Sequence, residues 1–411
     1  MSGFAYLFER FPSFTQTFCY REVQEMRRQG ENPPIYSIRR PPDIPRECPA
    51  DLAADVVYLP APDELGRKMK TMKMLGRYPW PIVRDIRLWG KRPGKARLIE
   101  AAWLGARLRE RGVHHVHAHF AGIAARTAFW MKKFYGVTFS FTGHANDMYC
   151  EPNSPVSLRD LVREAAFVVT ESEFSRDWLC RRMPEFDAKV HRIYNGMDIE
   201  GAPAATAREP VPQIVSVGRC IEKKGYADLI DACAILRKKG YEFECAILGG
   251  GPLEDSLRAR VAELGVGDRV RLLGPCPQDD VRSRLAAATI FVLACATEPD
   301  GGMDTLPTVI VEAMAAGLPV VSTRLAAVPE MVGHGVTGLL VDEKQPERLA
   351  SAIAELLRNP ALAERYGQAG KLAAAARFSS EPTVASLRAL LARVASDPEV
   401  SFSEKPSAPP Q

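Results

Sequence analysis

Short apolar runs alternate with amphipathic helical patterns through the second half of the chain, and this alternation constrains the fold more than any other feature. The run at 213–218 (QIVSVG) has the composition of a buried strand, and 226–240 has a helical period with basic residues in its last turn. The pairing recurs as far as residue 342. Apolar strands that alternate with helices form a parallel sheet covered on both faces, so we predict an α/β fold.

The first half repeats this pattern less regularly. Candidate strands lie at 34–38, 55–59, 112–118, 138–143, 166–172 and 188–196. A chain of 411 residues exceeds what one hydrophobic core usually holds, so we expect two doubly wound, Rossmann-like domains. Such sheets bind ligands beyond the carboxyl ends of their strands, and two facing edges would make a central cleft.

Composition changes along the chain give the expected domain boundaries. Residues 201–212 (GAPAATAREPVP) are rich in Ala and Pro, which is typical of a linker, and 398–411 are polar and Pro-rich, which is typical of a disordered tail. The expected parts are an N-terminal domain at 1–200, the linker at 201–212, a C-terminal domain at 213–378, a helix at 379–397 that crosses back to the N-terminal domain, and the tail.

The composition excludes several classes of protein. A net charge of +4 is too small to indicate nucleic-acid binding. Nine cysteines without a C-x-x-C pair argue against a disulfide framework and favour a reducing compartment. The N-terminus lacks the pattern of a signal peptide, and no apolar run reaches the roughly 18 residues of a spanning helix. We expect a cytoplasmic protein, at most peripheral on the inner face of the cytoplasmic membrane.

Two cations follow the strand at 213–218. Arg219 and Lys224 lie in VGRCIEKKG, on a short loop between a strand that ends at Gly218 and the next helix. Permanent positive charges beside a helix N-terminus suit a diphosphate. The alternative is a solvated basic turn.

Three consecutive glycines follow the next strand, in LGGGPLEDSL (248–257). Gly250 and Gly251 would let the backbone approach a ligand closely. The alternative is a tight strand–helix turn with Pro252 at the first helical position. The segment is not a dinucleotide fingerprint, because the later glycine is missing.

Two carboxylates flank the start of a helix at 307–316. Pro307 begins the helix, Asp304 lies in the loop before it, and Glu312 shares a helix face with Thr308. Free amides at the helix start favour an anion, and carboxylates beside an anion suit the hydroxyls of a sugar and a ribose. An exposed helical glutamate is the alternative for Glu312, although apolar neighbours argue for a paired one.

Four of the seven histidines fall within RGVHHVHAHFAG (111–122). His115, His117 and His119 alternate, so they share one face of a strand, roughly 6.6 Å apart. Zinc holds imidazole nitrogen at about 2.0–2.1 Å, so three histidines on a straight strand cannot converge on one ion. We therefore favour packing roles over a metal site.

The block from 213 to 345 resembles the donor-binding domain of glycosyltransferase family 4, whose members are retaining enzymes of the GT-B fold. The matching segments are VGRCIEKKG, LGGGPLEDSL, RVRLLG and DTLPTVIVEAMAAGLPVVST, joined in the first half by FTGHANDMY, ESEFSRDWL and KVHRIYNGMD. The opening RFPSFTQTFCYREVQEMRRQG is similar to enzymes that build bacterial exopolysaccharide. The family has two carboxylates with seven residues between them, as Asp304 and Glu312 have. The usual Glu-Gly-Phe-Gly is replaced by Asp304-Thr-Leu-Pro, a departure at the sugar contact.

The resemblance implies the function. It is metal-independent, retaining transfer of a hexose from a nucleotide-diphosphate sugar, such as a UDP-sugar or GDP-mannose, to a saccharide or lipid-linked saccharide. It implies a part in bacterial cell-surface polysaccharide or glycolipid synthesis, and no cofactor. The implied catalytic residues are His144, Arg219, Lys224 and Asp304. The implied donor-binding residues add Gly218, Gly250, Gly251, Thr305, Leu306, Pro307, Thr308 and Glu312. The acceptor-side candidates are Ser13, Thr15, Thr17, His119 and Asp147.

Residues 67–97 hold many Lys and Arg, a single acid, and interleaved tryptophans. That mixture suits an anionic membrane surface, and equally a solvated basic helix pair.

Two other functions use the same fold: a nucleotide-sugar epimerase, and a non-catalytic subunit that binds the nucleotide sugar. A nicotinamide dehydrogenase fits least well.

Overall fold

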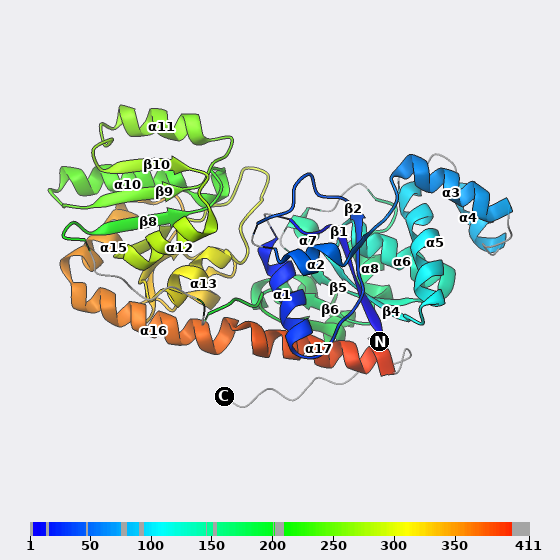
Figure 1. The fold of residues 1–411 in the computed structure, drawn as a ribbon. Helices are drawn as coiled ribbons and strands as arrows, with labels where there is room; N and C mark the ends of the chain where they lie inside the picture. The colour runs from blue at the N-terminus through cyan, green and yellow to red at the C-terminus, as the bar shows by residue number, and fades with distance from the viewer. Residues whose placement is uncertain are drawn as a thin grey trace. The chain divides into compact units, whose positions relative to one another are not determined.

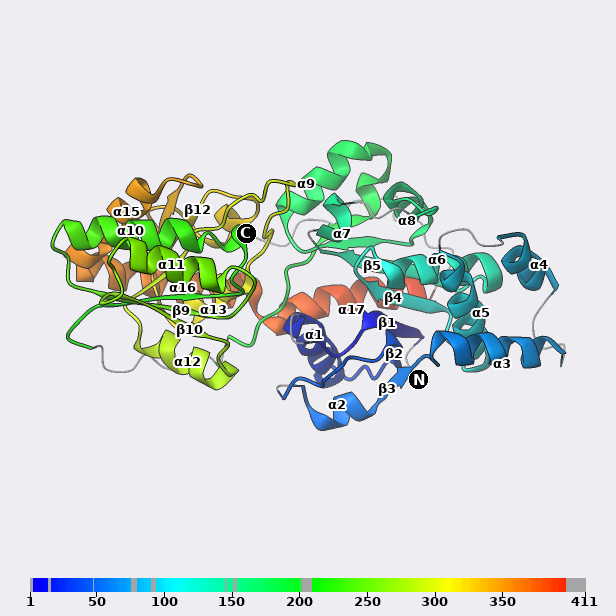
Figure 2. The same ribbon diagram turned by 90° about the horizontal axis from the view of Figure 1, so that it is seen from above.

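The computed structural model describes residues 3–13, 16–46, 48–74, 80–89, 94–144, 146–150, 154–199, 201 and 209–396. The chain forms two compact units. The first contains the residues up to Gly196 and those from Glu381 onward, and the second contains Met197–Ser380. Each unit is a parallel sheet with helices on both faces, which confirms the predicted fold class (Figures 1 and 2).

The first unit has the strand order β3-β2-β1-β4-β5-β6-β7. Its strands are β1 (Phe4–Arg10), β2 (Ile35–Arg39), β3 (Val56–Tyr58), β4 (His115–His119), β5 (Thr138–Gly143), β6 (Val168–Thr170) and β7 (Val190–Arg192). Its helices are α1 (Thr17–Arg28), α2 (Ala50–Ala54), α3 (Pro62–Met74), α4 (Trp80–Trp89), α5 (Lys95–Glu110), α6 (Ile123–Tyr135), α7 (Asn146–Tyr149), α8 (Leu158–Glu164), α9 (Glu173–Arg182), the short η1 (Pro184–Lys189) and α17 (Ser380–Ser396).

The second unit has the strand order β10-β9-β8-β11-β12-β13. Its strands are β8 (Gln213–Val217), β9 (Glu244–Leu248), β10 (Val270–Gly274), β11 (Ile290–Leu293), β12 (Val320–Thr323) and β13 (Gly338–Val341). Its helices are η2 (Glu222–Lys224), α10 (Tyr226–Lys238), α11 (Glu254–Glu263), α12 (Gln278–Ala287), α13 (Thr308–Ala315), α14 (Val328–Met331), α15 (Pro346–Arg358) and α16 (Pro360–Phe378). Strands β11, β12 and β13 are buried throughout, as strands covered on both faces must be.

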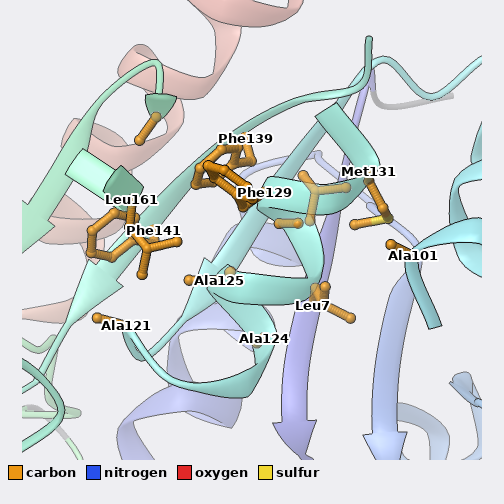
Figure 3. Close-up of a cluster of buried hydrophobic side chains, with 14 of the residues drawn as sticks. Leu7, Ala101, Ala121, Ala124, Ala125, Phe129, Met131, Phe139, Phe141 and Leu161 are labelled. Carbon is orange, nitrogen blue, oxygen red and sulfur yellow. The ribbon is translucent and has the colours of Figure 1, made fainter. Parts of the chain in front are cut away.

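A hydrophobic cluster fills the space between the first unit's sheet and α5, α6 and α8. In Figure 3 Phe129 of α6 lies against Phe139 of β5, and Ala125 of α6 lies on the side of Phe141. Alanines on this face of the helix let it pack closely on the strands, because short side chains leave room for the phenylalanine rings.

The C-terminal helix α17 covers the opposite face of that sheet beside α1. Its buried residues Val384, Leu387, Leu391 and Val394 recur at helical spacing and join a cluster with the aromatic side chains of β1. Burying four such side chains stabilises the docked helix by on the order of 6–12 kcal/mol before conformational entropy is counted.

The chain passes between the units at two adjacent points. Met197 N donates to Phe378 O at 2.7 Å, and Ser380 N donates to Met197 O at 3.0 Å, so the two crossings are hydrogen-bonded to each other. The division therefore falls after Gly196, before the segment 201–212 that was expected to be the linker. The carbonyl of Pro212, directly before β8, accepts from Glu244 N of β9. Residues 202–208 and the expected tail 398–411 lie outside the described residues.

The sequence analysis missed β1, although β1 lies in the middle of the first sheet between β2 and β4. Its segment FAYLFER is apolar on both faces and follows the N-terminus directly, so it shows no alternation that would separate it from a short apolar leader. The other first-half strands are found with ends moved by up to four residues, and β4 ends at His119 instead of Ala118.

Candidate functional site

In the second unit, polar side chains gather where β8 ends. Gly218 follows the strand, and Lys224 ends the short helix η2. The stem of Lys224 lies directly over Gly218, because a Cβ added there would be 2.9 Å from Lys224 Cε. Any other residue at 218 would thus displace the lysine.

Lys224 forms a partly buried ion pair with Asp304. Their side chains are only 13% and 24% exposed. Burial opposes ionisation of Asp304, but the Lys224 ammonium outweighs it and lowers the pKa of the carboxyl. Burial likewise opposes the charge on Lys224, and Asp304 outweighs it and raises the pKa of the ammonium. Both groups are therefore charged near neutral pH, and the fold brings two of the expected catalytic residues together.

Arg219 lies in the same loop and is exposed. Its positive charge adds to that of Lys224 in lowering the pKa of Asp304 and opposes the charge on Lys224. Arg219, Lys224 and Asp304 together carry a net positive charge at the carboxyl end of β8, and this charge favours the binding of an anion.

The glycines after β9 pack against the turn that follows β8. A Cβ at Gly249 would lie 1.9 Å from Gly218 O, and one at Gly251 would lie 2.7 Å from Cys220 O. The space that these glycines leave is occupied by the turn after β8, which is hydrogen-bonded to them through Cys220 N and Gly250 O at 2.9 Å. In the structure these glycines thus pack two loops together, and helix α11 begins at Glu254, two residues after Pro252.

Helix α13 begins at Thr308, one residue after the predicted start, with Pro307 at its N-cap. Thr305 and Leu306 are buried, and the Thr305 hydroxyl has no hydrogen-bond partner among the described residues. Glu312 is half-buried, and the residues on both sides of it, Val311 and Ala313, are buried. The strong apolar character of the helix leaves few positions for a charge, so Glu312 stands out as a functional candidate.

In the first unit, three polar residues follow neighbouring strands. His119 ends β4, His144 follows β5 and Glu171 follows β6. His144 Nδ1 lies 2.7 Å from Glu171 Oε2, and His144 Nε2 lies 3.4 Å from His119 Nδ1. Both ring nitrogens of His144 therefore face partners inside the protein. Burial, with a smaller contribution from His119, lowers the pKa of His144 well below its usual value, so the ring is neutral.

A neutral imidazole beside a carboxylate donates to it, so the proton of His144 is on Nδ1. His119 is linked at its other nitrogen to Glu22, since Nε2 lies 3.1 Å from Glu22 Oε1. The same Glu22 oxygen accepts from the Tyr6 hydroxyl at 2.8 Å. The site thus holds two carboxylate–imidazole pairs, which meet at the two rings.

Asp147 holds the loops after β4 and β5 together. Its carboxylate accepts from the backbone N–H of His144 at 2.8 Å and from that of Ala121. Burial raises the pKa of Asp147 well above its usual value, opposed by these backbone hydrogen bonds. Asp147, named above as an acceptor-side candidate, thus orients the loop that bears His144.

His115 and His117 pack in the sheet, as expected. Their ring nitrogens lie 2.8–3.0 Å from hydroxyls of Thr138, Ser140 and Thr142 on β5. Burial lowers the pKa of His115 to about 3, so it stays neutral. Glu22, His117 and His119 each place one ligand-type atom within 4.8 Å of the others, which makes them the one described cluster of metal-binding side chains. The imidazole nitrogens of that cluster already have hydrogen-bond partners within the protein.

The other acceptor-side candidates lie at the start of α1. Ser13 precedes the helix and Thr17 is its first residue, while Thr15 lies outside the described residues. The basic segment 67–97 forms parts of α3 and α5 and all of α4. Residues 75–79 and 90–93 and several other side chains of this segment lie outside the described residues. None of the helices in the described ranges is long and apolar enough to cross a membrane.

Sequence reasoning missed Glu22, Glu171, Phe18 and Phe120. Rings of both phenylalanines lie against His144, with centroids 4.7 and 4.5 Å from it. Glu171 directly follows an apolar strand, which is a signal that could have found it. Glu22 lies inside an amphipathic helix among other charges, so no local signal distinguishes it.

Two family models match this chain, one after the other. Residues 15–200 match "Glycosyltransferase Family 4", and residues 200–373 match "Glycosyl transferases group 1". Their junction lies close to the division between the two structural units.

Similar proteins include the amylovoran biosynthesis glycosyltransferase AmsK of Erwinia amylovora, 40% identical over 149 residues, which are 36% of this chain and 37% of AmsK. A GDP-mannose-dependent phosphatidylinositol monomannoside mannosyltransferase of Mycobacterium tuberculosis is 36% identical over 162 residues, 39% of this chain and 42% of the relative. The matches thus span well under half of these relatives. Anabaena HepE, solved with UDP, shares the fold with a TM-score of 0.69 at 18% identity, over 95% of this chain and all of HepE.

Proposed function

Because the chain belongs to glycosyltransferase family 4, we propose that it transfers a sugar, with retention, from a nucleotide-diphosphate sugar to a saccharide or lipid-linked saccharide. The observation that carries the proposal is the group at the end of β8, where Lys224, Arg219 and Asp304 lie close to the start of α13. Cations beside a helix N-terminus are suited to a diphosphate.

The proposed chemistry uses these charges on the leaving group. The bond from the anomeric carbon to the phosphate oxygen breaks, and a bond to the acceptor oxygen forms on the same face. The acceptor proton passes to the departing phosphate oxygen. Lys224 and Arg219 stabilise the negative charge that develops on the diphosphate, and no metal is required for this.

Asp304 has two functions in this proposal. In the structure it neutralises Lys224, which keeps the ammonium ordered at the site. When a diphosphate binds, the ammonium has a second anionic partner, and Asp304 can accept a hydroxyl of the sugar as well. Glu312 accepts hydroxyls of the nucleotide ribose.

His144 contacts the transferred sugar in this proposal. Its Nδ1 donates to Glu171 and its Nε2 faces the buried His119 ring, so the contact falls to its backbone carbonyl. That carbonyl accepts one hydrogen bond, from Asp147 N at 3.2 Å, and an amide oxygen has a second lone pair.

We further propose a part in bacterial cell-surface polysaccharide or glycolipid synthesis, because AmsK is named for amylovoran and the mycobacterial relative for a mannoside of phosphatidylinositol. GDP-mannose and UDP-sugars are the donors to test first, since one relative is named for GDP-mannose and HepE was solved with UDP. The exposed side of α4, with Arg84, Arg87 and Leu88, is the candidate contact with an anionic membrane.

Calorimetric titration of the full chain with UDP and GDP, in the presence of EDTA, tests the proposal. We expect one nucleotide to bind, and Arg219→Ala to weaken it at least tenfold, because a charge-assisted contact to phosphate is lost. Binding of neither nucleotide, or binding that Arg219→Ala leaves unchanged, would remove the basis for a donor site at the end of β8.

A further inference from the structure

We infer that Glu22, Phe18 and Phe120 form the part of the first unit that binds the acceptor saccharide, with the Glu22 carboxylate accepting a sugar hydroxyl. The inference rests on the proposed transfer for the nature of the ligand. It assigns the acceptor to residues that neither the sequence motifs nor the comparisons single out.

The position of Glu22 in the fold is the first argument. In the order β3-β2-β1-β4-β5-β6-β7, the chain winds outward in one direction from β1 and in the other from β4. Ligands of doubly wound sheets bind beyond the carboxyl ends of the strands at this switch point. Helix α1, which carries Glu22, follows β1, and Phe120 follows β4, so both belong to the switch point.

The hydrogen bonds of Glu22 are the second argument. Oε1 receives Tyr6 at 2.8 Å and faces His119 Nε2 at 3.1 Å. Among the described residues, Oε2 accepts no hydrogen bond. The Glu22 side chain is 18% exposed, whereas that of His119 is 1% exposed. One oxygen is thus held in place, and the other is available to a ligand.

The contacts of His119 indicate which of its ring nitrogens donates. Its Nδ1 lies 3.6 Å from Cys19 Sγ and 3.4 Å from His144 Nε2. Burial, with a contribution from Glu22, raises the pKa of Cys19 well above its usual value, so Cys19 is a thiol and can donate to Nδ1. His119 can then donate from Nε2 to Glu22. A carboxylate held by two donors is an acceptor that is already oriented for a hydroxyl.

The aromatic residues are the third argument. Phe18 and Phe120 are both only partly buried, and their ring centroids are 6.3 Å apart. Phe120 has a φ of 70°, a left-handed conformation that is strained for a bulky residue. Such strain at the end of a strand is typical of functional sites. A pyranose offers apolar C–H faces and a rim of hydroxyls, so it suits aromatic rings beside a carboxylate.

The test is saturation-transfer NMR of the full chain with three probes: methyl α-mannopyranoside, methyl α-glucopyranoside and methyl β-galactopyranoside. We expect at least one probe to bind, and Glu22→Gln to raise its Kd at least tenfold, because a charge-assisted hydrogen bond is lost. Phe120→Leu should raise it severalfold. Glu25→Gln is the matched control, because Glu25 lies on the same helix and bonds only to Arg28 and Gln29 in the described part of the chain.

Glu22→Asp provides a second variant, which keeps the charge but withdraws the carboxylate by one methylene, and should also weaken binding. Circular dichroism would show whether each variant is folded. The inference is overturned if no probe binds to the wild type, or if a folded Glu22→Gln binds the same probe within twofold of it. Zn²⁺ that binds the wild type but not Glu22→Gln would also overturn it, since Glu22 would then be a metal ligand.

UDP and GDP titrations of the same variants separate this inference from the proposed function. We expect their Kd values to be unchanged by Glu22→Gln. Failure of the wild type to bind either nucleotide would count against the proposed function, while the loss of glycoside binding in Glu22→Gln would still support the site described here.

Discussion

Replacing Lys224 by alanine should impair both catalysis and stability, by amounts that the structure lets us separate. The ammonium is the charge nearest to where we place the leaving diphosphate. Removing one fixed group that stabilises transition-state charge lowers kcat by about 10²–10³-fold. We expect a loss of that size when nucleotide release from the preferred donor is followed at saturation.

The cost in stability comes from Asp304, which loses its partner. Breaking a fully buried ion pair costs about 3–5 kcal/mol, and the 13% and 24% exposure of these side chains reduces the expected cost to about 1–3 kcal/mol. Asp304→Ala should cost a similar amount. The double variant Lys224→Ala/Asp304→Ala should cost less than the sum of the two, because neither charge is then left alone.

The pH dependence of this pair has a definite sign. The folded pKa of Asp304 is lowered, so its contribution is present above the unfolded pKa and is lost as pH falls through the folded value. The folded pKa of Lys224 is raised, so its contribution is present below the unfolded pKa and is lost as pH rises through the folded value. The coupling should therefore be constant from about pH 5 to about pH 9.

Thermal unfolding of the wild type, both single variants and the double variant measures the coupling, and Lys238→Ala, at an exposed position of α10, is the matched control. Additive losses in the double variant would refute the energetic coupling of the pair. A kcat within threefold of the wild type in folded Lys224→Ala would refute the leaving-group assignment.

Three further variants test other parts of the account. Glu312→Ala should raise the donor Kd about tenfold or more, because a hydroxyl–carboxylate contact is lost; an unchanged Kd in a titration would contradict the ribose assignment. Gly249→Ala should destabilise the protein by at least about 2 kcal/mol in denaturant unfolding, because its Cβ would lie 1.9 Å from Gly218 O and its φ is 130°, and a neutral effect would contradict the packing role. Burial raises the pKa of Glu100 to about 7, opposed chiefly by Arg97, so the wild type should lose up to about 3 kcal/mol of stability as pH rises from 4.5 to 7, and Glu100→Gln should not show that loss.

Much of the fold follows from patterns of short range. Alternating apolar strands and helices predicted both sheets, and the spacing of Pro307 and Gly317 predicted the limits of α13. These predictions hold because parallel strands buried on both faces are continuous apolar runs, and because helix ends favour particular residues such as Pro and Gly. β1 shows no such signal, and an Ala- and Pro-rich composition at 201–212 indicates irregular chain without fixing the residue at which the units divide, which is Gly196.

The candidate site, like the fold, could be predicted from the sequence only in part. Lys224 and Asp304 are 80 residues apart, and their pairing depends on where β8 and the loop before α13 end in the folded sheet. Glu22 and His119 are 97 residues apart, and no periodicity connects them. A sequence shows which side chains carry chemistry, but the partner of a buried charge is set by strand order and register, which emerge only in the folded sheet.

The central claim is that this chain moves a sugar from a nucleotide-diphosphate donor without a metal. The most direct measurement is nucleotide release from a panel of UDP-sugars and GDP-mannose in EDTA, with product mass determined after addition of saccharide or lipid-linked saccharide acceptors. The account predicts slow release from one donor, faster release with one acceptor, and a product heavier by one sugar residue. Binding of a donor with no release under any of these conditions would contradict it and indicate a non-catalytic nucleotide-sugar-binding protein instead.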